Sequence, residues 1–159
     1  MDEFYSDEDI ALLISEVKSI PVSLAHIGAK FREKRGHKEF DYFINRPDGS
    51  LFIMKIRQSL ENALAFSVIL ALQPKGKSEL FILRRYNGKN HRHRNRIEKD
   101  IAFYDFHIHT ATERYQNEGM YEEGYAVVTD RYVDLNGAIE SLIADCNIVS
   151  TNPQKDLFV

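Results

Sequence analysis

The sequence predicts an α+β fold, a mostly antiparallel sheet of five to seven strands with an N-terminal and a C-terminal helix packed on one face. Strand-like runs rich in β-branched and aromatic residues fill residues 39–132, short turn signals separate them, and helical periodicity occurs only near the two ends. The short turns favour a meander over βαβ units. The 159 residues suit one domain, which we expect over residues 1–149, with a flexible tail over residues 150–159.

The two expected helices are marked by apolar residues at helical spacing. The first begins at Ser6, an N-cap residue with Asp9 three positions later, as in a capping box. Apolar residues then recur at i, i+3, i+4 and i+7 up to Val17, and Pro21 closes the pattern. The second helix is expected over residues 135–146, whose apolar residues share one side.

The expected strands follow one another with short connections. They cover residues 39–46, 51–58, 65–72, 78–86, 101–115 and 125–132. Turn signals lie at residues 47–49 and 74–77, and Asn87-Gly88 is a favoured hairpin pair. The almost continuously apolar run at residues 65–72 is typical of a central strand that is covered on both faces. Residues 31–38 read as a polar connection.

Composition excludes two classes of protein. Ten Phe and eight Tyr supply a core that disordered chains lack. The longest apolar run, residues 63–72, is about half of what a bilayer requires, so we expect no membrane segment. The single cysteine, Cys146, excludes an intramolecular disulfide and favours a cytoplasmic location, and we expect its side chain in the core.

Charge is distributed unevenly along the chain. The net charge is −3, and residues 1–9 carry five acids without a base. Residues 84–96, in contrast, carry six bases without an acid. This basic segment suits an anionic partner such as RNA, although it could equally neutralise acids of the protein itself.

Four of the six histidines form two His-x-His pairs: His91 with His93, and His107 with His109. Because side chains alternate along a strand, each pair points to one side, and the second pair shares its face with Asp105 and Glu113. The loop at residues 96–100 is short enough to make the two segments antiparallel neighbours, so all four rings can meet.

One hypothesis is metal-independent acid/base chemistry on RNA or another phosphate-bearing anion, which needs no cofactor. A base, an acid and a cation are required for such cleavage, and imidazole can serve as either of the first two near neutral pH. The candidate catalytic residues are His107, His109, His91, His93 and Asp105. The candidate phosphate-binding residues are Arg85, Arg92 and Arg94.

Two other functions fit the same residues. Two or three imidazoles, with Asp105, Glu98 or Glu113, would suit a divalent transition metal. Alternatively, the protein is a non-enzymatic interaction module whose acidic helix or basic segment binds a cognate protein partner. The histidines could also be solvated strand residues without a function.

Part of the chain, about residues 80–115, resembles known bacterial sequences. The motifs that carry the resemblance are Arg85-Tyr86-Asn87-Gly88, His91-Arg92-His93-Arg94-Asn95, Phe106-His107-Ile108-His109 and Ala111-Thr112-Glu113-Arg114-Tyr115. They resemble an uncharacterised group of small bacterial proteins, some carried on mobile elements, and more distantly the TumE-like toxins of toxin–antitoxin pairs. The resemblance implies a sheet with this strand order and a His/Arg site.

Overall fold

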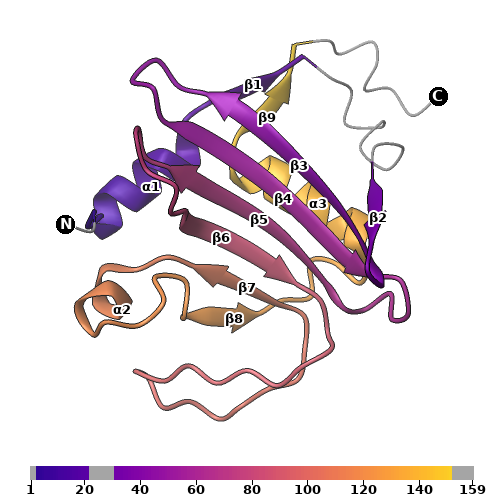
Figure 1. The fold of residues 1–159 in the computed structure, drawn as a ribbon. Helices are drawn as coiled ribbons and strands as arrows, with labels where there is room; N and C mark the ends of the chain where they lie inside the picture. The colour runs from indigo at the N-terminus through magenta and orange to yellow at the C-terminus, as the bar shows by residue number, and fades with distance from the viewer. Residues whose placement is uncertain (1–2, 22–30, 152–159) are drawn as a thin grey trace.

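The computed structural model describes residues 3–21 and 31–151 and confirms the α+β fold. One antiparallel sheet holds seven strands that lie side by side in chain order (Figure 1). They are β2 (Arg32–Lys34), β3 (His37–Asn45), β4 (Leu51–Ser59), β5 (Phe66–Gln73), β6 (Phe81–Asn87), β7 (His107–Thr110) and β8 (Ala126–Val128).

The expected central strand is confirmed as β5, fourth in the order of seven. Val68 and Leu70 on this strand are completely buried on the face that joins the core. Ser67 and Ile69 on the other face are only partly buried, so the expected cover is complete on one face and partial on the other. The turn expected at residues 47–49 joins β3 to β4, and Gly49 adopts a φ of 90°, which favours glycine. The hydrophobic pattern and turn chemistry therefore set the register of the central strands together.

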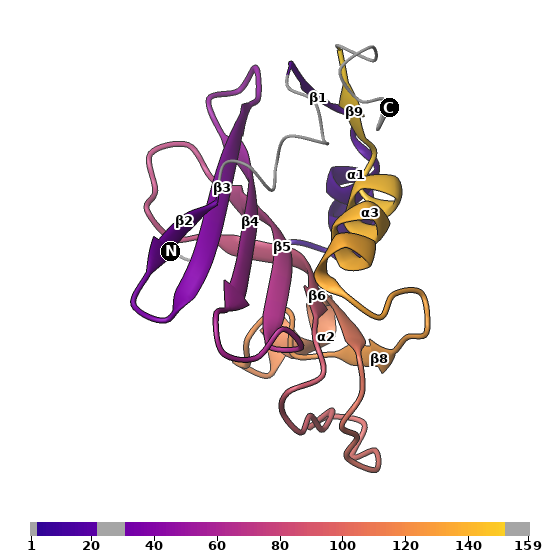
Figure 2. The ribbon, with the colours of Figure 1, turned by 90° about the vertical axis from the view of Figure 1, so that its right-hand side faces the viewer.

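Two helices cover one face of the sheet, as expected (Figure 2). Helix α1 (Asp7–Ser15) starts with a complete capping box, in which the Asp9 amide donates to Ser6 Oγ over 3.0 Å. Helix α3 (Leu135–Asp145) is capped by Asp134, whose side chain accepts from the Gly137 amide over 2.8 Å. Their apolar sides join the sheet in one core, which leaves the opposite face of the sheet for polar residues.

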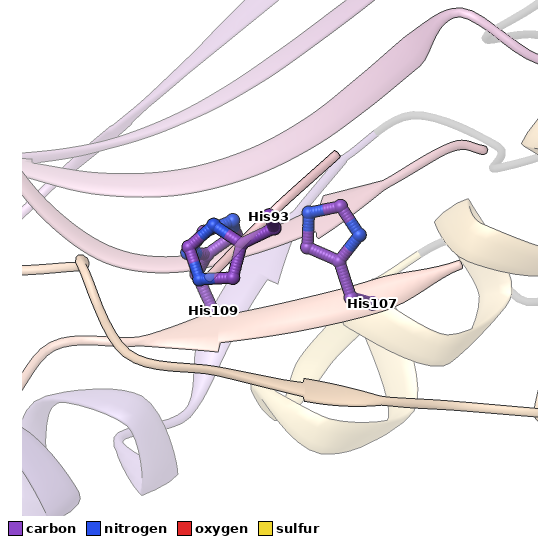
Figure 3. A group of neighbouring side chains, drawn as sticks. All are labelled: His93, His107 and His109. Carbon is purple, nitrogen blue, oxygen red and sulfur yellow. The ribbon is translucent and has the colours of Figure 1, made fainter. Parts of the chain in front are cut away.

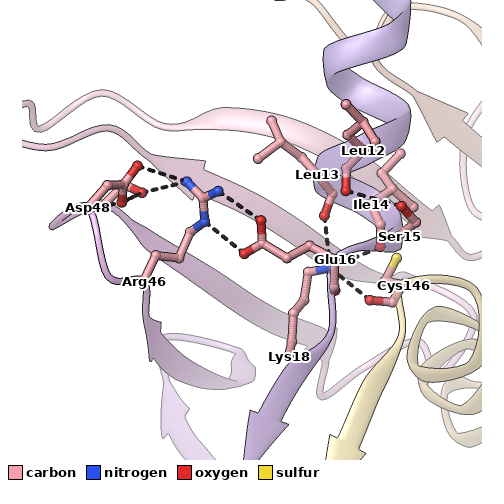
Figure 4. Close-up of polar contacts among 10 residues, drawn as sticks. Leu12, Leu13, Ile14, Ser15, Glu16, Lys18, Arg46, Asp48 and Cys146 are labelled. Atoms are coloured by element: carbon pink, nitrogen blue, oxygen red, sulfur yellow. Dashed lines mark hydrogen bonds and ion pairs between the residues drawn. The ribbon is translucent and has the colours of Figure 1, made fainter.

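The N-terminal helix is shorter than expected. It ends at Ser15, and Lys18–Ile20 form β1, which pairs in parallel with β9 (Ile148–Ser150). The physical reason is Lys18, which is 1% exposed and directs its ammonium at the last carbonyls of α1 and at the end of α3 (Figure 4). Its Nζ donates over 2.7 to 2.9 Å to the carbonyls of Leu13, Ile14, Glu16 and Cys146.

The C-terminal end also differs from expectation. Residues 148–150 belong to β9, so the start of the expected tail lies in a strand, and residues 152–159 lie outside the described part of the chain. Cys146 is a buried free thiol, as its place on an apolar helix side predicts. Among the described residues, no helix is long and apolar enough to cross a membrane.

The prediction of one long strand over residues 101–115 is wrong. Only β7 is regular, and Thr112 caps a short helix, α2 (Glu113–Asn117), by accepting from the Tyr115 amide. The Asn87-Gly88 pair does not form a hairpin, because the Gly88 amide instead donates to the Phe66 carbonyl over 2.9 Å. Residues 88–106, called the arm below, then leave the sheet and return to it as β7 (Figure 1).

The other differences are at strand ends. The segment expected to be a polar connection, residues 31–38, contains β2 and the start of β3. The strand expected over residues 125–132 is limited to β8, because the chain then turns towards α3.

Candidate functional site

The arm and β7 bring three histidines into contact, namely His93, His107 and His109 (Figure 3). The ring centroid of His93 lies 5.4 Å from that of His107 and 4.8 Å from that of His109. One ring nitrogen from each residue lies within 4.8 Å of the other two. The ring of His91 lies 5.3 Å from His107, so the four histidines gather as expected, but His91 is exposed and outside the group of three.

Strand geometry places two of the rings, and a bridge in the arm places the third. His107 and His109 lie two residues apart on β7, opposite Asn87 and Arg85 of β6. Side chains two apart on a strand share a face, so both rings point to the polar face of the sheet. His93 is paired with Phe103 by two backbone hydrogen bonds of 2.9 Å, which turn the arm back over β7.

Backbone carbonyls orient the two buried rings. His107 Nδ1 donates to the Asp105 carbonyl over 2.8 Å, and His109 Nδ1 donates to the Glu123 carbonyl over 2.6 Å. A carbonyl oxygen can only accept, so each Nδ1 carries the proton and each Nε2 keeps its lone pair. The Asn87 amide donates to His107 Nε2 over 3.3 Å, which agrees with that assignment.

A buried amide orients the third ring. The Nδ2 of Asn95 donates to Asp100 and to the Ala126 carbonyl, while its Oδ1 accepts from the Ala126 amide. This pattern fixes Oδ1 as the acceptor for His93 Nε2, at 2.9 Å, and leaves Nδ1 of His93 with its lone pair. In each of the three rings one nitrogen is held by an oxygen of the protein, and the other nitrogen is the candidate ligand atom. In His107 that atom, Nε2, already accepts from the Asn87 amide, so a ligand there has to displace this hydrogen bond.

The environment keeps the buried rings neutral. Burial lowers the pKa of His107 to about 4, and the neighbouring His91, His93 and Arg85 act in the same direction. Burial lowers the pKa of His109 to about 3, again with the nearby rings and Arg85. Both imidazoles are uncharged at pH 7, which is the state that binds metals and not the state that donates a proton.

A cationic cleft of about 1020 Å³ opens beside His93 and His109. Five basic residues line it: Arg85, Arg92, Arg94, Arg96 and Lys99. Arg85 Nη2 donates to Glu123 Oε1 over 2.9 Å, while the other four have no carboxylate partner within ion-pair distance in the described part of the chain. The cleft thus offers several uncompensated positive charges to an anion.

The acids expected at the site do not join the histidine group. The carboxylate of Asp105 is half exposed and lies 3.6 Å from Lys89 Nζ, so only the backbone of Asp105 serves His107. Glu98 is held by Arg114 at 2.6 Å. Glu113 belongs to α2, because Thr112 is the last extended residue before this helix.

Two residues of the site were not predicted. Asn95 shares one side of the 91–95 segment with His91 and His93, and this alternation was a usable signal. Glu123 had no such signal, since it lies in a loop 14 residues after His109. Its side chain is 11% exposed, and burial raises the pKa of its carboxyl. Its Oε2 is buried without a hydrogen-bond partner among the described residues.

Comparison of the chain with models of known families, with curated proteins and with solved structures gave no match.

Proposed function

We propose that His93, His107 and His109 bind a divalent transition metal, and that the site acts on a phosphate-bearing anion held in the adjacent cleft. The observation that carries this proposal is the convergence of three ring nitrogens within 4.8 Å. Neutral imidazole is a preferred ligand of zinc and its neighbours in the transition series.

The ligand set has the composition of a catalytic site. Three protein ligands that leave a fourth position open are typical of catalytic zinc, whereas structural zinc is enclosed by four ligands. Tetrahedral bonds of about 2.1 Å would place the nitrogens about 3.4 Å apart, so the rings need to approach by about 1.4 Å at most. Outer hydrogen bonds from imidazole N–H to carbonyls, as seen here for His107 and His109, fix such ligands in place.

The cleft supports a phosphate-bearing ligand. A divalent metal can polarise a phosphoryl oxygen or activate a water, and nearby cations stabilise the developing negative charge. Arg85 lies directly opposite His109 on the neighbouring strand, and Arg92 and Arg94 line the same cleft. The three candidate phosphate-binding arginines therefore line the cleft that the proposed metal position faces.

Metal-independent acid/base catalysis is less well supported by the same geometry. The two most buried rings are neutral at pH 7, and their N–H groups are bound to carbonyls of the protein. A ring in that state has no proton to give to a leaving group. Ligation of a metal uses the lone pair that remains.

Metal content is the direct test. Protein made without a polyhistidine tag is freed of metal, and the binding of Zn²⁺ or Co²⁺ is titrated calorimetrically. We expect one equivalent, and we expect His93→Ala to lose it, since His93 is only half-buried and the fold should survive its removal.

Two controls make the test specific. His37→Ala removes an imidazole outside the group and should leave one equivalent bound. His109→Gln keeps most of the side-chain volume and should lose binding as His93→Ala does. Absence of uptake by the native protein, or equal uptake by all variants, contradicts the proposed metal centre.

A further inference from the structure

We propose a second anion-binding subsite on the open face of the sheet, which makes the ligand an extended phosphodiester chain and not a single small phosphate. This inference rests on the proposed function, because it extends the same ligand away from the histidines. The subsite is a cavity of about 470 Å³ that is lined in part by His91, with Arg35, Arg57 and Arg85 in its wall.

The register of the sheet connects the new subsite to the histidines. Arg57 pairs with Ser67, Ser67 with Asn87, and Asn87 with His107. Directly opposed residues of an antiparallel sheet point to the same face, so these four side chains form one row across it. Three strand spacings of about 4.8 Å separate Arg57 from His107, roughly 14 Å in all. One phosphate cannot occupy both positions, whereas a chain of several phosphates can.

Arg85 joins the two cavities into one path. It lies in the wall of both the large cleft and the smaller cavity. One of its terminal nitrogens is used by Glu123, and about a third of the side chain remains exposed. A ligand that passes from one cavity to the other therefore crosses this guanidinium.

The cations of the smaller cavity are available to a ligand. Glu39, which faces Arg57 across the strands, is engaged by Lys34 at 3.7 Å and by His37 at 3.3 Å. Among the described residues, the hydrogen-bond partner of the Arg57 side chain is a ring nitrogen of His37, over 3.3 Å. Arg35 is exposed at the turn between β2 and β3, where it adopts a φ of 43°. None of the described residues that line this cavity is acidic.

The concentration of positive charge around the two cavities is unusual for a protein whose overall charge is negative. Within the described part of the chain, seven lysine and arginine side chains and two carboxylates line the two cavities, although the whole protein has a net charge of −3. Such a separation of charge attracts a polyanion and weakens with added salt.

The test compares short and long phosphodiester chains. Binding of the oligothymidylates dT2 and dT8, and of the oligouridylate rU8, is measured calorimetrically at low salt with the metal-loaded protein. We expect dT8 or rU8 to bind at least tenfold more tightly than dT2, and Arg57→Ala to reduce octamer affinity at least fivefold. The same variant should change dT2 affinity less than twofold, since dT2 is too short to reach both subsites.

Matched variants separate the subsite from general electrostatics. Arg35→Ala should repeat the effect of Arg57→Ala, whereas Lys75→Ala, which removes an exposed charge outside both cavities, should not. The inference is overturned if Arg35→Ala and Arg57→Ala leave the octamer affinity unchanged, or if they lower the affinities for the octamer and for dT2 equally. The octamer that loses more affinity in Arg57→Ala identifies which of the two nucleic acids the subsite prefers. If the native protein takes up no metal but binds the octamer more tightly than dT2, and Arg57→Ala removes that difference, the metal centre is refuted and the subsite is upheld.

Discussion

Backbone carbonyls, and not carboxylates, orient the two buried imidazoles of the site. Strand alternation predicted that His107 and His109 share a face, and the structure agrees. It also placed Asp105 beside them as an orienting carboxylate, but only the carbonyl of Asp105 reaches His107. Sequence patterns predict where side chains point along a strand, whereas a backbone acceptor depends on how the chain bends before it.

Asn95 provides a test of how the third ring is positioned. We expect Asn95→Ala to weaken Zn²⁺ binding about 10- to 100-fold, because His93 Nε2 loses the oxygen that holds it. Affinity is measured by competition with a chelator. The variant also removes the hydrogen bonds to Ala126, so urea unfolding of the metal-free protein reports the accompanying loss of stability separately.

A variant beside the site provides the control for Asn95. Asn90→Ala removes a contact to the exposed His91 ring and should leave metal affinity within about twofold of the native value. Unchanged Zn²⁺ affinity in Asn95→Ala would show that His93 is not a ligand held by this amide.

The arm between β6 and β7 was the largest error in the predicted elements. Asn87-Gly88 matches a hairpin signal, but Gly88 lies so close to the residues before β5 that a Cβ atom there would come within 1.9 Å of the Leu64 carbonyl oxygen. The glycine is therefore required by close packing and not by a tight turn. The residues that follow bring the ring of His93 against His107 and His109 of β7, and local propensity does not encode this contact.

Lys18 links the ends of α1 and α3, and its removal should be costly. Burial lowers its pKa to about 8, so the side chain is still an ammonium at pH 7 and serves four carbonyls. We expect Lys18→Met to lower the free energy of unfolding by about 3 kcal/mol, because those acceptors are left without a donor. Urea denaturation measures the change.

The matched control for Lys18 is Lys55→Met. Lys55 forms a partly exposed ion pair with Asp41 at 3.0 Å, and pairs of this kind contribute less than about 1 kcal/mol. Equal losses in the two variants would contradict the special role of Lys18 at the helix ends.

Considered as a whole, the molecule has a structural face and a charged face. The fold class and the order of the main strands were predictable, because alternating hydrophobicity and turn residues are local signals. The parallel pairing of β1 with β9 was not, since it joins segments about 130 residues apart along the chain. The seven cations around the histidines likewise come from the arm, β4, β6 and the turn before β3, and only the fold brings them together.

The central claim is that three particular imidazoles form one metal centre, and an NMR titration of all six histidines tests it most directly. Without metal, the rings of His107 and His109 should stay neutral from pH 7 down to about pH 5, because burial lowers their pKa values to about 4 and 3. One equivalent of Zn²⁺ at pH 7 should shift the ring signals of His93, His107 and His109 and leave that of His37 unchanged. Titration of His107 and His109 near pH 6.5, or a Zn²⁺ response that does not single out the three rings, would contradict the account.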